Sequence, residues 1–321
     1  MVIASWQDLV ERTLAGEPRA LARLVTLVEN RAPGWREAMK TLYPRTGRAR
    51  ILGITGSPGA GKSSLTNRLA AGFVERGHRV GVIAVDPSSP FSGGALLGDR
   101  LRMKDVATAE GVFIRSMATR GSLGGLCQGA RDVGRVLDAA GYDLVLIETV
   151  GVGQDEIDVV RAADLVMMIC VPGQGDGIQA IKAGVMEIAD VFVVNKCDRD
   201  GADQVEADIR GMLALAGDEP GDVETVFQTD SLSGRGVPDL LDALAARIER
   251  ACDPERGLRR ARDEVLGLVE GEIAQRVRTW IEDGERLGSC VERIRSRRSD
   301  PYSAAESLIA DFDRVGADPH E

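Results

Sequence analysis

The sequence predicts an α/β fold in which a mostly parallel central sheet is flanked by helices. Five short runs rich in Val, Ile and Leu recur between residues 50 and 198, and the segments between most of them are long enough for a helix. Each run ends in a polar or glycine-containing cluster. Ligands of open α/β sheets bind outside the carboxyl ends of the strands, so we expect these clusters to converge in space.

The five expected strands begin at Arg50, Arg79, Asp143, Asp164 and Asp190. They read RILGITG, RVGVIAVD, DLVLIETV, DLVMMICVPG and DVFVVNKCD. Near-continuous apolar runs bounded by turn residues are typical of strands that are buried on both faces. Crossover helices are therefore expected on both sides of the sheet.

Helical periodicity marks both ends of the chain, so we expect an N-terminal helical extension over 1–46, a sheet domain over 47–250 and a C-terminal helical region over 251–321. Asp300 and Pro301 are a plausible cap and first-turn residue for a last helix. The apolar stripe after residue 250 fits either an internal core or an oligomer seam. Its members are Leu258, Ala261, Val265, Leu268, Val277 and Ile281. In the N-terminal extension, the apolar residues at helical spacing are Trp6, Leu9, Val10, Leu14, Leu21, Leu24, Val25 and Val28.

The composition predicts a globular protein and argues against several functional classes. The 321 residues are 44% hydrophobic and 28% charged, which is typical of a globular chain with a sizeable core. The net charge of −10 argues against broad nucleic-acid binding. Five scattered Cys without CxxC spacing and only two His predict reduced thiols and neither disulfides nor a zinc site. Without a signal-peptide pattern or a bilayer-length apolar stretch, we expect a cytoplasmic protein with no membrane partner.

A phosphate-binding loop follows the first expected strand. The segment GSPGAGKS, residues 56–63, fits GxxxxGK[ST] between a strand and a helix beginning near Ser63. Glycines let the backbone wrap around phosphate, Lys62 would reach the β- and γ-phosphates, and the Ser63 hydroxyl would bind Mg²⁺. The candidate nucleotide-binding residues here are Gly59, Ala60, Gly61, Lys62, Ser63 and Ser64.

The fifth expected strand closes with NKCD, residues 195–198, which fits the NKxD pattern. The carboxylate of Asp198 can accept hydrogen bonds from both N1–H and the exocyclic amine of guanine, with Asn195 and Lys196 beside it. Adenine offers no such pair, and a site of this kind discriminates by about 10⁴-fold or better. Ser231 and Leu232, in TDSLSGRG, form either a second guanine-side loop or a plain turn.

Acidic residues near the other strand ends are candidate ligands of Mg²⁺, together with Ser63. Asp86 ends the second run, Asp99 follows it, and Glu148 ends the third. Oxygen ligands of this kind suit a hard cation, so the sequence predicts GTP or GDP with Mg²⁺ as the bound cofactors.

The segment ETVG, residues 148–151, occupies the place where many GTPases carry DxxG. The N–H of Gly151 could sense the γ-phosphate, so Lys62, Asp86, Glu148 and Gly151 are the candidate catalytic residues. Val152 follows, where Ras-type enzymes have the glutamine that orients the attacking water. An apolar side chain cannot orient water. We therefore expect slow basal hydrolysis that a partner accelerates, with Gln154 as one substitute.

Together these motifs resemble the MeaB/ArgK-type P-loop GTPases that accompany adenosylcobalamin-dependent acyl-CoA mutases, the methylmalonic aciduria type A proteins among them. The resemblance spans nearly the whole chain. Its most specific stretches are GSPGAGKSSL, VIAVDPSSPFSGGALLGDRLRM, ETVGVGQDE, VPGQGDGIQAIKAGVMEIADVFVVNK and DPYSAAESL. Ser122 departs from the pattern, because many relatives carry His there.

The resemblance implies that GTP binding and hydrolysis gate cofactor delivery to a mutase and help to exclude inactivated cobalamin. It also implies a mobile switch in VPGQGDGIQAIK, where Asp176, Gln179 and Lys182 would relay the nucleotide state, and a homodimer through the C-terminal helices. Two other classes stay open: a transport-linked phosphotransferase, which has no need to select guanine, and a nickel-insertion GTPase, which two His and no paired Cys disfavour.

Overall fold

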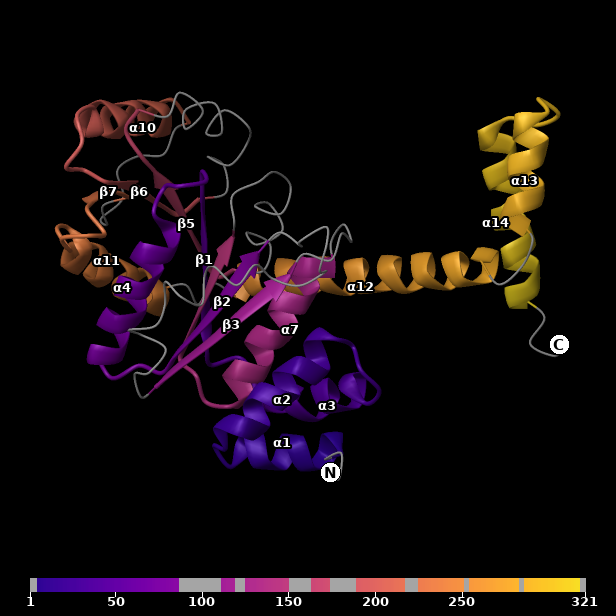
Figure 1. Ribbon diagram of the computed structural model, residues 1–321, viewed down its shortest axis with the longest axis horizontal. Helices are drawn as coiled ribbons and strands as arrows, with labels where there is room; N and C mark the ends of the chain where they lie inside the picture. The colour runs from indigo at the N-terminus through magenta and orange to yellow at the C-terminus, as the bar shows by residue number, and fades with distance from the viewer. Residues whose placement is uncertain are drawn as a thin grey trace. The chain divides into compact units, whose positions relative to one another are not determined.

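The fold was analysed in a computed structural model, which describes residues 5–86, 111–118, 125–149, 163–173, 189–216, 225–250, 254–282 and 286–317 (Figure 1). The chain divides into two compact units, Met1–Cys252 and Asp253–Glu321. The first contains the sheet with the helices that cover it, and the second contains helices.

The described part of the first unit forms a seven-stranded sheet in the order β3-β2-β4-β1-β5-β6-β7, with every pair parallel. The strands are β1 (Arg50–Gly56), β2 (Val80–Asp86), β3 (Val112–Ala118), β4 (Leu144–Thr149), β5 (Leu165–Cys170), β6 (Val191–Asn195) and β7 (Val226–Thr229). From central β1 the chain moves outward to β2 and the edge strand β3, and then returns through β4 to β5 on the other side of β1. The expected α/β class is confirmed, and the sheet is wholly parallel rather than mostly so.

All five predicted strands are present, and two further strands were not predicted. Both of these lie at the edges of the sheet, where a strand has one neighbour and needs less apolar surface. In β3 the apolar run is broken by Arg115, whose guanidinium forms an ion pair with Glu29. In β7, which has only four residues, Gln228 donates to the carboxylate of Glu206 at 2.7 Å.

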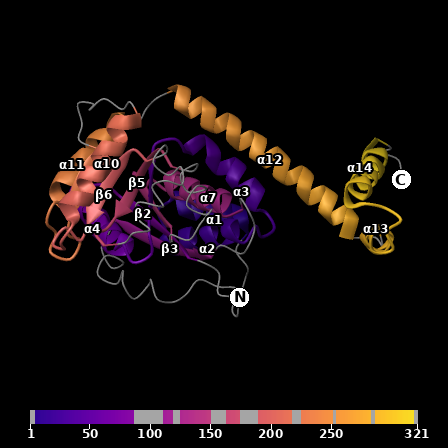
Figure 2. The ribbon, with the colours of Figure 1, turned by 90° about the horizontal axis from the view of Figure 1, so that it is seen from above.

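Helices cover both faces of the sheet (Figures 1 and 2). α4 and α11 bury one face, where Leu52 and Ile54 of β1 belong to the same apolar cluster as Leu65 and Leu240. On the other face α7 covers β2 and β4, with the N-terminal helices packed against α7, while α10 covers β5 to β7. The helices of this unit are α1 (Trp6–Leu14), α2 (Pro18–Glu29), α3 (Trp35–Leu42), η1 (Tyr43–Arg45), α4 (Lys62–Glu75), α7 (Gly125–Ala139), α10 (Ala202–Ala216) and α11 (Val237–Arg250).

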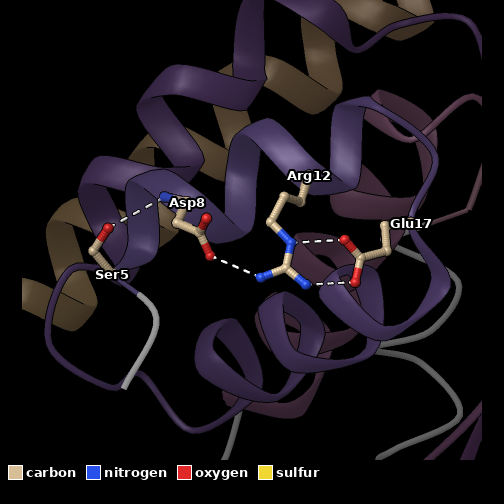
Figure 3. Close-up of polar contacts among 4 residues, drawn as sticks. All are labelled: Ser5, Asp8, Arg12 and Glu17. Carbon is tan, nitrogen blue, oxygen red and sulfur yellow. Dashed lines mark hydrogen bonds and ion pairs between the residues drawn. The ribbon is translucent and has the colours of Figure 1, made fainter. Parts of the chain in front are cut away.

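The junction of α1 and α2 is fixed by one arginine (Figure 3). The Ser5 hydroxyl caps α1 by accepting a hydrogen bond from the Asp8 N–H at 3.2 Å. Arg12 donates from Nε and Nη2 to the two carboxylate oxygens of Glu17, at 2.7 and 2.5 Å, and from Nη1 to Asp8 at 3.1 Å. This bidentate contact lowers the pKa of the Glu17 carboxyl and links α1 to the start of α2.

Aspartates organise the amino ends of three strands. Each stands one residue before β4, β5 or β6, and its carboxylate accepts a hydrogen bond from a backbone N–H in or just before an adjacent strand. The pairs are Asp143 with Arg79, Asp164 with Ile51 and Asp190 with Val166, at 2.7, 2.7 and 2.8 Å. The side chain thus extends the hydrogen-bonding ladder past the end of its own strand and helps to fix the register.

The second unit consists, over its described residues, of α12 (Pro254–Glu282), α13 (Arg286–Arg295) and α14 (Pro301–Ala317). Its small core includes Trp280 and Phe312, whose rings meet edge to face at 5.6 Å. The predicted cap of the last helix is present, because the Asp300 carboxylate accepts from the N–H groups of Tyr302 and Ser303 at 2.9 and 3.0 Å. Donation by the Ser303 hydroxyl contributes most to lowering the Asp300 pKa.

One side of α12 carries exposed apolar residues within its own unit. They line a shallow groove formed by Val265, Leu268, Val269, Glu272 and Ile273. Within the described residues, no helix combines the length and the apolar character needed to cross a bilayer. The described cysteines Cys170, Cys197 and Cys290 are free thiols.

Candidate nucleotide-binding site

The loop between β1 and α4 depends on glycine. Gly56 has a φ of +142°, and a Cβ there would lie 2.2 Å from the carbonyl oxygen of Ile169 in β5. Gly61 has a φ of +90° and occupies the N-cap position of α4, with no side-chain hydrogen bond to cap the helix. The partial positive charge at this end of the helix favours an anion.

Lys62 holds its ammonium group at this loop. Its side chain is only 6% exposed, and Nζ donates to the carbonyl oxygens of Gly56 at 2.6 Å and Ser57 at 3.0 Å. These carbonyls orient the positive charge at the mouth of the loop. A triphosphate could accept hydrogen bonds from the same ammonium group. Its oxygens carry full negative charge, so they would bind the ammonium more strongly than the carbonyls do.

Asn195 connects the phosphate loop to the loop that follows β7. Its amide is fully buried at the end of β6, and Nδ2 donates to the Ala60 carbonyl at 2.8 Å and to the Ser231 hydroxyl at 3.2 Å. Its Oδ1 accepts from the Ser231 N–H at 3.0 Å and from the Thr229 hydroxyl at 3.2 Å. Both the nitrogen and the oxygen of the amide are therefore hydrogen-bonded. These bonds join the end of β6 to the loop after β1 and to the end of β7.

The rest of the NKCD segment turns back over the same loop. Lys196 adopts a φ of +59°, unusual for a residue with a side chain, and its Nζ donates to the Gly59 carbonyl at 2.6 Å. The Cys197 N–H donates to the Thr229 carbonyl at 3.0 Å, which ties the segment to β7. Asp198 follows with an exposed carboxylate, accessible to a base.

The loop after β7 is organised around Asp230. Its carboxylate accepts from the N–H groups of Leu232 at 2.9 Å and Ser233 at 3.1 Å. The Ser233 hydroxyl makes the largest contribution to lowering the Asp230 pKa, followed by the Leu232 N–H. Ser231 is buried against Asn195, whereas the Leu232 side chain is 80% exposed. The segment is thus a hydrogen-bonded loop that contacts Asn195, and its role beside a guanine base stays a prediction.

Two oxygen ligands suited to Mg²⁺ meet beside the phosphate loop. The Ser63 hydroxyl donates to Oε1 of Glu148 at 2.5 Å, and the Glu148 side chain is 5% exposed. Glu148 lies in register with Ile54 of β1 and Ala84 of β2. It is therefore near the carboxyl end of β4, between two neighbouring strands. A hydroxyl and a carboxylate this close fit a hard cation.

The backbone of Asp86 ends β2, next to β4. Its side chain lies outside the described residues, as do Asp99, Ser122, Gly151, Val152, Gln154, Asp176, Gln179 and Lys182. Their roles stay predictions.

Sequence reasoning missed two residues of the site. Thr229 holds Asn195, and Arg68 of α4 donates from Nε and Nη2 to the carbonyl oxygens of Ser231 and Leu232. A threonine at a strand end and an arginine in a helix are both common as ordinary surface or core residues. No local pattern marks either one, because their partners are far away along the chain.

Comparison with known proteins places this arrangement in a family. The family model described as "Methylmalonyl Co-A mutase-associated GTPase MeaB" matches residues 21–282. A GTPase-named protein of Pyrococcus abyssi is 47% identical over 312 residues, which cover 95% of this chain and 96% of that protein. A mitochondrial methylmalonic aciduria type A homolog of Caenorhabditis elegans is 40% identical over 209 residues, covering 60% and 52% of the two chains.

A solved structure agrees with this relationship. The crystal structure of an LAO/AO transport system kinase superimposes with a TM-score of 0.70 at 28% identity, covering 98% of this chain and 99% of that chain. The wholly parallel sheet, the glycine loop and the buried asparagine at its edge thus occur in a chain that matches the family over most of its length. The protein belongs to the MeaB family of P-loop GTPases.

Proposed function

We propose that this protein binds and slowly hydrolyses GTP, and that the nucleotide cycle gates adenosylcobalamin loading of an acyl-CoA mutase and protects that enzyme. The observation that carries the proposal is the buried Asn195 amide, which joins the phosphate loop at Ala60 to the guanine-side loop at Ser231. Both ends of a guanine nucleotide would therefore be bound by one connected framework.

The phosphate end of the proposed site uses the backbone N–H groups at the start of α4 and the Lys62 ammonium. Ser63 and Glu148 would hold Mg²⁺, which supplies positive charge against the phosphate oxygens when bound. Asp86, and Asp99 beyond it, are the proposed additional ligands. Because position 152 is valine, no glutamine there can orient water, so we expect slow hydrolysis by the isolated protein.

The base end uses Asp198, whose exposed carboxylate follows a segment fixed to both the phosphate loop and β7. Guanine offers N1–H and its exocyclic amine to one carboxylate, whereas adenine would leave that charge without partners. Membership of a GTPase family supports the same ligand.

The mutase partner is inferred from the relatives. The matching family is described as associated with methylmalonyl-CoA mutase, and the Caenorhabditis elegans relative is a methylmalonic aciduria type A homolog. We extend the proposal to Asp176, Gln179 and Lys182 as the switch that reports the nucleotide state to the mutase.

A homodimer is part of the proposal, because the apolar side of α12 is exposed within its unit. The groove from Val265 to Ile273 would be buried against a second copy. Size measurement by light scattering tests this directly. Val269→Glu should then give monomers, and Glu270→Gln on the same helix should leave the dimer intact.

The deciding experiment is GTP turnover by the pure protein, alone and with an adenosylcobalamin-dependent acyl-CoA mutase from the same source. A slow basal rate that the mutase raises many-fold supports the proposal and identifies the client. A basal rate already at the level of partner-stimulated GTPases contradicts the expectation drawn from Val152. No stimulation by any of the mutases from that source contradicts the chaperone role.

A phosphotransferase is the second candidate, because the solved structure that covers nearly the whole chain is described as a kinase. The same assay separates the two functions when γ-³²P-labelled GTP is used. Label released as inorganic phosphate supports the GTPase. Label retained on a protein or amino-acid acceptor supports the kinase.

A further inference from the structure

Arg68 joins α4 to two backbone carbonyls of the loop after β7. It stands six positions after Lys62, on the helix that begins where the phosphate loop ends. Its half-buried guanidinium donates from Nε to the Ser231 carbonyl and from Nη2 to the Leu232 carbonyl. A planar fork that binds two successive carbonyls fixes two successive peptide groups at once.

The direction of these peptides follows from covalent geometry. In a planar trans peptide the C=O and N–H bonds point in opposite directions. Because Arg68 holds the carbonyls of Ser231 and Leu232, the N–H groups of Leu232 and Ser233 point away from α4. The Asp230 carboxylate accepts both of these N–H groups from the far side, at 2.9 and 3.1 Å. The loop is therefore clamped between a cation and an anion.

One glycine of the loop is consistent with the contacts of Arg68. Gly234 has a φ of +90°, and a Cβ there would lie 2.9 Å from Nη1 of Arg68. A side chain at position 234 would press on the guanidinium that holds the loop. The chain therefore leaves room for Arg68 at the point where any other residue would crowd it.

We infer that Arg68 is a positioning residue for guanine selectivity, which it controls by aiming the Ser231–Leu232 peptide at the carbonyl oxygen of the base. The inference rests on the proposed placement of guanine against Asp198. That carboxylate takes the N1–H and amine of the base, so the neighbouring O6 needs a hydrogen-bond donor. The Leu232 N–H, which donates to the Asp230 carboxylate at 2.9 Å, lies in the loop that follows β7, beside the end of β6. Guanine would share this donor with Asp230 or replace Asp230 as its acceptor.

The test compares three nucleotides with wild type, Arg68→Met and Arg68→Lys. GTP has all the recognised groups, ITP lacks the exocyclic amine that faces Asp198, and 6-thio-GTP replaces O6 with sulfur, a weak acceptor. We expect Arg68→Met to weaken GTP binding by about 10- to 30-fold but 6-thio-GTP binding by about threefold or less. The preference for GTP over ITP should stay the same, and Arg68→Lys should lie between wild type and Arg68→Met.

The matched control is Arg76→Met. Arg76 caps the same helix, and its Nη2 donates to Asp242 of α11 at 2.6 Å, away from the loop. It should leave all three affinities unchanged. If Arg68→Met does not fold, as judged by its thermal transition, the Arg68→Lys measurements decide the question.

An equal loss of all three nucleotides in the Arg68 variants would overturn the inference, because it would show a general structural role. So would wild-type protein that binds 6-thio-GTP as tightly as GTP. That second result would leave the proposed function standing as long as GTP is still preferred over ITP. Failure of the proposed function would look different, since the wild type itself would show no preference for GTP over ITP or ATP.

Discussion

The side-chain nitrogen of Asn195 lies 2.8 Å from the Ala60 carbonyl oxygen and 2.4 Å from the point that a Cβ on Gly61 would occupy. The close approach of β6 to the phosphate loop therefore depends on the absence of a side chain at position 61. The glycine there is required both by a φ of +90° and by a neighbour that cannot move without losing its hydrogen bonds.

Gly61→Ala should destabilise the nucleotide-free protein far more than Gly59→Ala. Both alanines must adopt a positive φ, which costs about 1 kcal/mol. Only the alanine at 61 meets another atom, because nothing lies within 4 Å of a Cβ at Gly59. We expect a thermal midpoint lowered by about 2–4 °C for Gly59→Ala and by at least twice that for Gly61→Ala. Equal shifts measured by calorimetry would contradict the packing argument.

Asp198→Asn should change the base preference from guanine to xanthine. Xanthine carries an oxygen where guanine has its exocyclic amine, and an asparagine amide can donate to that oxygen. We expect GTP affinity to fall on the order of 10³-fold while XTP affinity rises. Isothermal titration measures both, and Asp200→Asn, two residues along and also exposed, is the control that should bind GTP normally. Retention of GTP binding by Asp198→Asn would place the base elsewhere.

The cysteine thiols should differ widely in reactivity. Burial in the sheet raises the pKa of the Cys170 thiol to about 12, so almost none of it is thiolate at pH 8. Cys197, half-buried at the NKCD turn, is accessible to a small reagent. Iodoacetamide at pH 8 followed by peptide mass spectrometry should therefore label Cys197 in the folded protein and Cys170 only after denaturation. Early labelling of Cys170 would show that β5 opens readily.

The Arg12–Glu17 contact should stabilise the N-terminal helices in a pH-dependent way. Arg12 lowers the pKa of the Glu17 carboxyl below the ordinary value of 4.5 for a glutamate. The stabilisation is therefore complete above 4.5 and is lost as the pH falls through the lower, folded-state value. Glu17→Gln should lower the thermal midpoint at pH 7, and its difference from wild type should shrink below pH 4.5. Glu11→Gln serves as the control on α1, and a difference that grows at acid pH would contradict this account.

Much of the sheet could be predicted because its inner strands are apolar almost throughout. β4, β5 and β6 are buried along their whole length, and most of their residues are Val, Ile, Leu or Met. The edge strands β3 and β7 escaped prediction for the opposite reason. Arg115 and Gln228 occupy positions that face a helix and find charged partners there, which interrupts the apolar run.

The site was predictable where one short segment contains the chemistry, as in the phosphate loop and NKCD. What could not be predicted is how these segments hold one another. The hydrogen bond of Asn195 to Ala60 spans 135 positions, and that of Arg68 to Ser231 spans 163. Contacts over such separations depend on the order of the strands in the sheet, and local sequence patterns do not predict that order.

The span from Ala60 to Asn195 also has a meaning for the growing polypeptide. Synthesis proceeds from the N-terminus, so the phosphate loop leaves the ribosome long before the asparagine that braces it has been translated. Until then the Ala60 carbonyl has no amide to bond, and Gly61 has no neighbour to accommodate. A nascent chain that stops short of β6 therefore has the phosphate-loop sequence without the side chain that braces it.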